Sequence, residues 1–381
     1  MTPAGVQGEL MSWSKQQSDA ITAVRAWLED RRAPQVFRLF GYAGTGKTTI
    51  AKEIARLING TVLFGAFTGK AALVLRTKGC DGASTIHSMI YKVEDDESGK
   101  PTFRLNRDSD VGTAKLVIID ECSMVGPELG ADLLSFGTRV LVLGDPAQLP
   151  PVKGTGFFID AKPDFMLTDI HRQAADNPII RMSMDVREGR RLQIGRHGDS
   201  RVVRRGELGR EELAAAVMAA DQVLCGINRT RRSFNARLRE LHGMAEMGDW
   251  RPVAGDRLIC LRNNKDKGLL NGSLWDLIDI GHQNDSITEG KVESADGTSA
   301  GKVEIVVPVE FFKGTEDRLD WKMRRECDEF DYGYAITVHK SQGSQYDDLV
   351  VFDESGAFRD CRMNHLYTAI TRAAERITVV V

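Results

Sequence analysis

Residues near the N-terminus have the types and the spacing that bind nucleotide phosphates. The segment GYAGTGKT at residues 41–48 fits the P-loop pattern and lies between an apolar stretch and a helical pattern. In such a loop, successive backbone N–H groups and the start of the helix surround the phosphates. We expect Lys47 to reach the β- and γ-phosphates and Thr48 to offer its hydroxyl to Mg²⁺. The predicted nucleotide contacts in and beside this segment are Gly44, Thr45, Gly46, Lys47, Thr48 and Thr49.

Two acids follow a second apolar stretch. Asp120 and Glu121 come directly after the run VII at residues 117–119, which predicts a buried strand. Acids at a strand end are often only caps, but a P-loop in the same chain favours a catalytic pair. We expect Asp120 to hold Mg²⁺ and Glu121 to orient the attacking water as a base.

A third segment carries an amide and an acid on a stiff backbone. The sequence GDPAQLPP at residues 144–151, called the Gln148 loop below, follows the run VLVL at residues 140–143. That run predicts a buried parallel strand, and ligand sites lie at the carboxyl ends of such strands. Three prolines restrict the backbone of the loop. The loop indicates an ATPase in which the state of the bound nucleotide affects another part of the molecule or a partner. We expect Gln148 to sense the γ-phosphate.

Alternating elements must position these residues. Predicted strands at residues 36–40, 61–67, 115–120 and 139–144 alternate with helical patterns such as the one at residues 48–58. This alternation predicts an α/β fold in which helices cover both faces of a parallel sheet. A polar segment interrupts it and predicts a hairpin insert at about residues 89–113.

The second half repeats the α/β pattern around an insertion. A helix is expected at residues 177–188, a strand at 222–226 and a basic helix at 230–242. Residues 253–330 are rich in glycine, aspartate and short β-like runs, which predict a small inserted β-barrel. Within it, residues 283–301 are expected to form a loop or hairpin tip.

These patterns divide the chain into three predicted domains. The first spans residues 1–163, and the second combines residues 164–252 with residues 331–381. The inserted domain spans residues 253–330.

Composition limits the function classes. The chain has 381 residues, of which 42% are hydrophobic, and contains no apolar run near the roughly 20 residues of a membrane span. Its six cysteines are scattered and form no CxxC pair, which argues against disulfides and structural zinc and fits a reducing cytoplasm. The net charge of −3 argues against a general DNA-coating protein but leaves room for a localised basic groove.

The ordered motifs from residue 13 to the C-terminus resemble those of superfamily 1 helicases, in the RecD-like and Dda-like branch called superfamily 1B. The resemblance implies two RecA-like P-loop motor domains, with a hairpin in the first and a small SH3-like β-barrel in the second. It also implies ATP and Mg²⁺ as cofactors. Under this resemblance the acids at residues 120–121 are motif II and the Gln148 loop is motif III.

Four further motifs imply nucleotide contacts. WSKQQ at residues 13–17 resembles the Q motif, so Gln17 is implied to contact adenine. DIHRQ at residues 169–173 resembles motif IV and implies a γ-phosphate contact by Arg172. Motif V, VHKSQGSQ at residues 338–345, includes Gly343, and motif VI, LYTAITR at residues 366–372, ends in Arg372 as a second arginine finger. Such an arginine contributes about 10³ to 10⁵ in rate, so its delivery from a second domain would make hydrolysis depend on cleft closure.

The implied nucleic-acid contacts are hydroxyls, cations and one aromatic ring. TGKAA at residues 68–72 resembles motif Ia, although Phe67 replaces the usual proline, and TIH at residues 85–87 resembles the following DNA-contact motif. These groups suit a grip on the backbone that is independent of sequence. Phe103 on the predicted hairpin is a candidate to stack on a base or wedge a duplex. The full set of candidates is Thr68, Lys70, Thr85, His87, Phe103, Thr337, His339 and Lys340.

The function implied is an ATP-driven single-stranded DNA translocase that unwinds duplex DNA from 5′ to 3′. The polarity comes from the branch alone. We expect a stand-alone cytoplasmic monomer without membrane partners, acting on single strands and single-strand/duplex junctions. Single-strand-binding, replication, repair and recombination proteins are candidate partners.

Two alternatives remain open on the sequence. An RNA-directed or protein-displacing translocase could use the same motor, because backbone contacts barely distinguish the nucleic acids unless a 2′-hydroxyl is recognised. A nucleotide-gated binding or loading protein would bind nucleic acid without separating strands, although the two predicted arginines fit it poorly.

Overall fold

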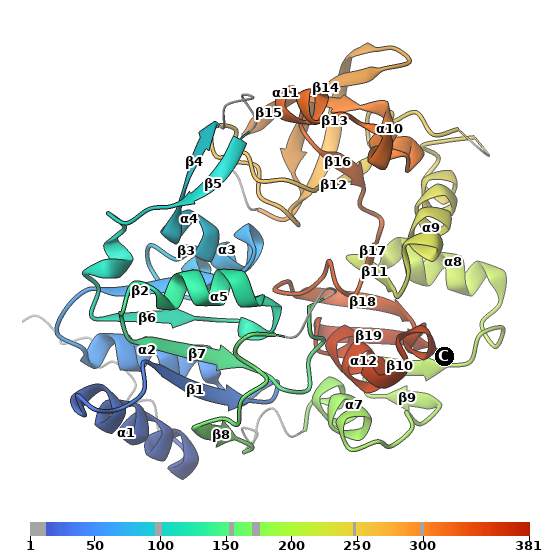
Figure 1. The fold of residues 1–381 in the computed structure, drawn as a ribbon. Coiled ribbons are helices and arrows are strands. Elements are labelled where there is room, and N and C mark those ends of the chain that lie inside the picture. The colour runs from blue at the N-terminus through green and yellow to red at the C-terminus, as the bar shows by residue number, and fades with distance from the viewer. Residues whose placement is uncertain (1–12, 96–100, 152–155, 170–175, 247–248, 298–300) are drawn as a thin grey trace, which may run out of the picture.

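The computed structural model describes residues 13–95, 101–151, 156–169, 176–246, 249–297 and 301–381. Two largely parallel sheets lie side by side, and a third, antiparallel sheet lies over the gap between them (Figure 1). The prediction of an α/β fold with parallel sheets is therefore confirmed. No helix in the described ranges is long and apolar enough to cross a membrane.

The first sheet has the strand order β3-β2-β6-β7-β1-β8, and all its pairs are parallel. We call this sheet with its helices the first lobe. Its strands are β1 (Val36–Gly41), β2 (Val62–Ala66), β3 (Ser84–Thr85), β6 (Leu116–Ile119), β7 (Val140–Gly144) and β8 (Phe165–Leu167). Its helices are α1 (Lys15–Glu29), α2 (Lys47–Leu57), α3 (Gly69–Thr77), α4 (Ile86–Ile90) and α5 (Pro127–Leu134).

The strand order of the first lobe brings its three chemical segments together. Every residue of β6 and β7 is buried, as expected for apolar strands covered on both faces. β7 lies between β6 and β1, so the loops that follow these strands leave neighbouring points on one edge. The P-loop, the acid pair and the Gln148 loop are those three loops.

The second sheet has the order β17-β11-β18-β19-β10-β9 and is parallel except for the β9–β10 pair. We call it, with its helices, the second lobe. Its strands are β9 (Gly195–His197), β10 (Ser200–Val203), β11 (Gln222–Cys225), β17 (Ala335–Thr337), β18 (Tyr346–Phe352) and β19 (Ala373–Val380). Its helices are α7 (Pro178–Arg187), α8 (Arg210–Ala219), α9 (Asn228–Leu241) and α12 (Arg362–Ile370).

The third sheet is built from the segment between α9 and β17. Its antiparallel order is β15-β14-β13-β12-β16. The strands are β12 (Arg257–Cys260), β13 (Leu274–Gln283), β14 (Ile287–Ser294), β15 (Lys302–Pro308) and β16 (Phe330–Tyr332), with short helices α10 (Val309–Lys313) and α11 (Trp321–Glu326). The expectation of a loop or hairpin tip at residues 283–301 is wrong for β14, which pairs on both sides.

A two-stranded ribbon leaves the first lobe toward the third sheet (Figure 1). It consists of β4 (Tyr91–Asp95) and β5 (Pro101–Leu105), which pair antiparallel. Phe103 on β5 is 65% exposed. The ribbon thus exposes most of a large apolar ring to solvent.

Candidate nucleotide site between the lobes

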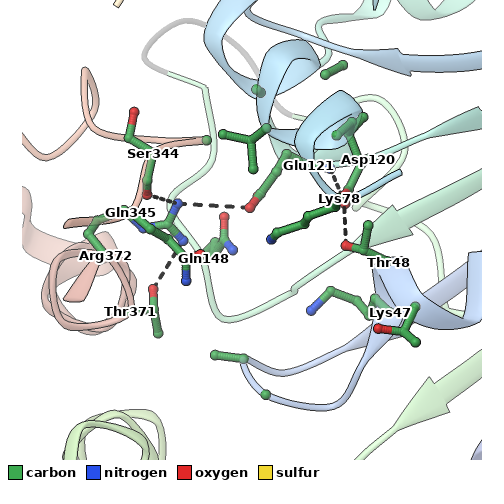
Figure 2. A pocket seen from close by; sticks show the side chains of 18 of the residues that line it. Lys47, Thr48, Lys78, Asp120, Glu121, Gln148, Ser344, Gln345, Thr371 and Arg372 are labelled. Atoms are coloured by element: carbon green, nitrogen blue, oxygen red, sulfur yellow. Dashed lines mark hydrogen bonds and ion pairs between the residues drawn. The ribbon is translucent and has the colours of Figure 1, made fainter. Parts of the chain in front are cut away.

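A cavity of about 290 Å³ lies between the two lobes at the carboxyl ends of β1, β6 and β7. Its walls combine the P-loop and acid pair of the first lobe with residues 343–345 and 371–372 of the second (Figure 2). Ten predicted site residues line it: Gly44, Gly46, Lys47, Thr48, Thr49, Asp120, Glu121, Gln148, Gly343 and Arg372. The structure therefore gathers residues that are up to 328 positions apart in the chain.

The P-loop places one cation and one hydroxyl at the start of α2. Gly46 is the N-cap of this helix, and the Lys47 Nζ donates to the backbone oxygens of Gly41 and Tyr42 at 2.7 and 3.0 Å. The Thr48 hydroxyl donates to the Asp120 carboxylate at 3.0 Å. A helix start with free N–H groups and a nearby ammonium group is a suitable site for phosphate.

Asp120 is a buried carboxylate close to the P-loop. Burial is the largest cause that raises its pKa, and the adjacent Glu121 carboxylate adds to it, while the Lys47 ammonium and the Thr48 hydroxyl act in the opposite direction. A cation beside Asp120 would favour its charged form. A carboxylate and a hydroxyl at this distance are the oxygen ligands that Mg²⁺ uses beside nucleotide phosphates.

Glu121 faces an arginine of the other lobe. Its backbone adopts the left-handed conformation, with φ of 51°, which is uncommon for a residue with a side chain. Its carboxylate lies 3.9 Å from the Arg372 guanidinium, which is 5% exposed. Arg372 is itself held by donation to the backbone oxygen of Ser344 at 3.3 Å (Figure 2). It also donates to the backbone oxygen of Thr368 at 3.3 Å.

Gln148 extends from its loop into the same cavity wall. The side chain is 6% exposed, and no described residue is a hydrogen-bond partner of its Oε1 atom. Leaving a buried acceptor unpaired costs about 1–3 kcal/mol. This unpaired amide, the Thr48–Asp120 pair and the P-loop cation all fit a bound nucleotide with Mg²⁺.

The second lobe holds the backbone of the Gln148 loop. Asn364 on α12 donates to the backbone oxygens of Ala147 and Gln148 at 3.1 and 3.2 Å. The Leu149 N–H donates to the Thr368 hydroxyl at 2.8 Å, and the Gln342 side chain donates to the Leu149 oxygen at 3.0 Å. Leu149 is 1% exposed and belongs to the hydrophobic core of the second lobe. The loop therefore moves with α12 unless these contacts break.

Tyr367 connects three of the cavity's segments through one hydroxyl. It accepts from the Ala43 N–H of the P-loop at 3.0 Å and donates to Asp145 at the start of the Gln148 loop at 2.7 Å. Tyr367 is 1% exposed and lies five residues before Arg372. Burial raises the pKa of Asp145, so this carboxylate depends on its hydrogen bonds from Tyr367 and from the Ala147 N–H.

Gly343 lets the two lobes approach closely. A Cβ atom at this position would lie 2.8 Å from the Ala71 Cβ of α3, and its φ of 77° is also unfavourable for other residues. Gly343 therefore lines the nucleotide cavity at a point where the close packing of α3 leaves no room for a side chain.

Two predicted nucleotide contacts do not line the cavity, and a third cannot be placed. Gln17 is buried and forms a capping box with Ser14 at the start of α1, while its amide donates to the Thr45 backbone oxygen at 3.2 Å. Thr45 is also buried and bonds back to Tyr42. Both residues brace the P-loop, and the adenine contact of Gln17 stays a prediction. Arg172 lies outside the described residues.

A second cavity, of about 600 Å³, lies between the lobes on the side of the third sheet and is called the channel cavity below. The predicted nucleic-acid residues that line it are Thr68, Lys70, Thr337, His339 and Lys340. Thr85, His87 and Phe103 do not line it. His87 and Phe103 belong to a row of rings that starts at Phe67 in the cavity wall, with centroid distances of 5.9 Å from Phe67 to His87 and 6.1 Å from His87 to Phe103.

Several of these residues also have structural partners. Thr68 and Thr85 are the N-caps of α3 and α4, and their hydroxyls accept from Ala71 and Ser88 N–H groups. Lys70 is 7% exposed and forms an ion pair of 3.0 Å with Asp296, which follows β14 of the third sheet. The sequence predicts Lys70 as a contact to DNA phosphate. In this structure its ion pair with Asp296 joins the first lobe to the third sheet.

Other residues of the site were not predicted individually. Lys78 and Gln345 line the nucleotide cavity, and Asn364, Tyr367 and Thr368 hold the Gln148 loop. Tyr367 and Thr368 lie inside a motif that the sequence reveals, but only their contacts show what they do. Asn364 lies two residues before that motif and gives no local signal.

Comparison with known proteins agrees with this geometry. Residues 13–207 match the family model described as an AAA domain, and residues 332–380 match the UvrD-like helicase C-terminal domain. The ATP-dependent RecD2 DNA helicase of Deinococcus radiodurans is 29% identical over 366 residues, covering 89% of this chain and 46% of the relative. The RecBCD enzyme subunit RecD of Mycobacterium tuberculosis is 25% identical over 428 residues, covering 92% of this chain and 68% of the relative.

A solved structure shares the fold. The Pif1 helicase from Bacteroides in complex with ADP-AlF3 and ssDNA superposes with a TM-score of 0.57 at 18% identity, covering 97% of this chain and 93% of that one. The chain spans about half the length of the Deinococcus relative. The two family models and the RecD relatives place this chain in the superfamily 1B helicases, among the RecD-like members.

Proposed function

We propose that this protein is an ATP-dependent single-stranded DNA translocase that unwinds duplex DNA from 5′ to 3′. The observation that carries the proposal is the Glu121–Arg372 approach of 3.9 Å across the nucleotide cavity, with the Gln148 loop bonded to the helix before Arg372. A catalytic acid from one lobe and an arginine from the other can act together only while the lobes are close. The names of the RecD2 and Pif1 relatives support DNA as the substrate.

The proposed roles at the nucleotide follow from the contacts. Lys47 and the P-loop N–H groups bind the phosphates, and Thr48 and Asp120 hold Mg²⁺, which supplies charge neutralisation at the phosphates. Glu121 orients the attacking water and Gln148 contacts the γ-phosphate region. Arg372, with Arg172 as a second candidate, stabilises the charge that develops during transfer. Gly44, Thr45, Gly46, Thr49 and Gly343 complete the site, with Gln17 at the adenine.

Movement is proposed to arise from the same contacts. Loss of the γ-phosphate removes the group that Lys47 of the first lobe and Arg372 of the second lobe both contact, so the lobes separate. The channel cavity lies between the same lobes, and its width changes with theirs. Alternating grip by Thr68 on one side and Thr337, His339 and Lys340 on the other then advances the strand. Lys70 joins this grip when its ion pair with Asp296 opens.

Two appended parts are proposed to guide DNA. The β4–β5 ribbon, with exposed Phe103, is a candidate pin at a single-strand/duplex junction, with Thr85 and His87 at its base. The third sheet is proposed as an SH3-like insert within residues 253–330, between two motor domains at residues 1–163 and at 164–252 with 331–381. We further propose a cytoplasmic monomer that cooperates with single-strand-binding or replication and recombination proteins.

Tailed duplexes test the proposal. One substrate carries a 5′ single-stranded tail and the other a 3′ tail, and both are assayed with ATP and Mg²⁺. We expect strand separation from the 5′-tailed duplex only. Separation from the 3′-tailed duplex alone would overturn the polarity, and DNA-stimulated hydrolysis without separation from either would favour a loading protein.

RNA substrates complete this experiment. The same tails made of RNA are expected to stimulate hydrolysis less than DNA. Stronger stimulation by RNA would instead favour the RNA-directed alternative.

A further inference from the structure

An aromatic ring of the second lobe reaches the channel cavity with one side already covered. Phe358 lies in the 3₁₀ segment η4 (Ser355–Cys361) and lines the cavity as a half-buried residue. Its ring stacks on the imidazole of His365, with a centroid distance of 4.0 Å and an interplanar angle of 17°. Because His365 is 1% exposed and lies behind Phe358, the part of the Phe358 ring left uncovered meets the cavity.

The His365 imidazole behind the Phe358 ring makes no hydrogen bond that would explain its buried position. Neither ring nitrogen of His365 has a hydrogen-bond partner among the described residues. Burial is the main cause that lowers the pKa of His365 to about 4, so the ring is neutral near pH 7. An imidazole with both nitrogens unpaired is an expensive way to fill a core position that an aliphatic side chain could occupy. What it provides is a flat surface parallel to Phe358.

The neighbouring backbone fixes the position of the Phe358 ring. Arg359, the next residue, has φ of 44° and ψ of −111°, and such strained conformations gather at functional sites. On the other side, a Cβ atom on Gly226 would lie 3.0 Å from Phe358 Cε2 and 2.8 Å from the Glu354 Cβ. Glu354 in turn accepts from the N–H groups of Gly226 and Ile227 at the start of α9. The ring is therefore held rigidly between two segments.

The surroundings of the ring suit one nucleotide of a single strand. Phe67, Met124 and Ile227 supply apolar walls, and Thr337 and Lys340 supply a hydroxyl and a cation on the same side as Phe358. The His339 ring lies 5.7 Å from the Phe358 ring, tilted by 43°. The volume of about 600 Å³ is in the range of ligand cavities, roughly 300–1,000 Å³.

We propose that Phe358, backed by His365, is a stacking platform for a nucleobase of the single strand in the channel cavity. The proposal rests on the proposed function, because it requires a single strand in this cavity. It adds that the protein grips a base here, in addition to the phosphates. Any base can stack on such a ring, so the platform does not select a sequence.

A strand without bases isolates this contact. Binding of a short oligodeoxythymidine is compared with binding of an oligomer of the same length made of abasic deoxyribose phosphates. Base stacking on an aromatic side chain contributes roughly five- to hundredfold in affinity. We expect the unmodified protein to prefer the base-bearing strand, and Phe358→Ala to reduce that preference by about tenfold while its affinity for the abasic strand stays unchanged.

Two further variants separate stacking from folding. Phe358→Tyr keeps a flat ring and is expected to keep the preference, whereas Phe358→Leu covers His365 without a flat ring and is expected to behave like Phe358→Ala. Each comparison between the two strands is made within one variant, so a general loss of stability cancels. Trp321→Ala removes an exposed aromatic ring that does not line the channel cavity, and it is expected to leave the preference unchanged.

The outcomes distinguish the two proposals. A preference that survives unchanged in Phe358→Leu, or equal binding of both strands by the unmodified protein, overturns the platform and leaves the helicase proposal standing. Failure of the unmodified protein to bind any single strand overturns both.

Discussion

The nucleotide cavity and the channel cavity lie between the same two lobes but are built differently. The nucleotide cavity is lined by charged and amide side chains from both lobes. Hydrogen bonds that involve Tyr367, Thr368 and Asn364 connect its two sides. The channel cavity is larger, and its lining combines the apolar side chains of Phe67, Met124, Ile227 and Phe358 with a larger number of polar ones. This difference is what we expect if the first site needs fixed distances for hydrolysis and the second site lets a strand pass.

The comparison predicts that changes in the nucleotide cavity act mainly on rate. Arg372→Ala should lower the kcat for ATP hydrolysis by about 10³ to 10⁵, because the charge on the transferring phosphoryl group loses its partner from the second lobe. Steady-state hydrolysis measures this, and nucleotide binding should change much less. Arg376→Ala is the matched control, since Arg376 pairs with Asp348 away from the cavity. A fall of less than tenfold for Arg372→Ala would remove it from the transition state.

Gln148→Ala tests whether the loop senses the nucleotide. Truncation removes an amide that lines the cavity and whose buried Oε1 has no partner among the described residues, but leaves the backbone contacts of the loop to α12 in place. We expect the DNA-stimulated kcat to fall by about 10², in the range for loss of one preorganised polar group, with nucleotide affinity largely kept. Unchanged stimulation by DNA would show that Gln148 plays no part in coupling.

Tyr367→Phe tests the connection between the two sides of the nucleotide cavity. The change removes one hydroxyl and leaves the buried ring, so the Ala43 N–H and the Asp145 carboxylate each lose a partner. A cost of about 1–2 kcal/mol should lower the DNA-stimulated rate by roughly tenfold and affect the basal rate less. Tyr346→Phe is the control, because no described residue bonds to the Tyr346 hydroxyl. Equal loss of basal and stimulated rates would indicate a purely structural role for Tyr367.

The smallest effect is expected at the edge of the channel cavity. Asp296→Asn should free Lys70 from its ion pair and let it meet a DNA phosphate. Single-strand affinity should rise a few-fold at low salt, and the slope of log K against log salt should steepen by about 0.7, as expected for one more phosphate contact on a single strand. An unchanged slope would mean that Lys70 only joins the first lobe to the third sheet.

The sequence predicts the residues of the nucleotide cavity that follow buried strands, but not the contacts between distant segments. The P-loop, the acid pair and Gln148 each follow a buried apolar strand within a few residues, and a parallel sheet brings such loops to one edge. The contact from Tyr367 to Asp145 spans 222 positions, and no local pattern indicates it. Thr68 and Thr85 are predicted as DNA contacts from the motifs that they resemble, but their hydroxyls cap helices, so the motif alone does not separate the two roles.

The third sheet shows a second limit. In β14, buried and more exposed residues alternate, and the exposed ones include the charged Lys291 and Glu293, so the stretch resembles a polar loop. Only its pairing with β13 and β15 reveals the strand. Strands whose exposed face carries charged residues, such as β14, are therefore harder to predict than the buried strands that carry the nucleotide site.

We propose above that closure of the lobes couples ATP hydrolysis to the strand in the channel cavity. The most direct measurement is the rate of ATP hydrolysis by the unmodified protein with and without unstructured single-stranded DNA, at saturating ATP and Mg²⁺. We expect a clear increase in the kcat for ATP hydrolysis, which levels off as the DNA concentration rises. A rate that does not respond to DNA, from protein that binds both ligands, would contradict it.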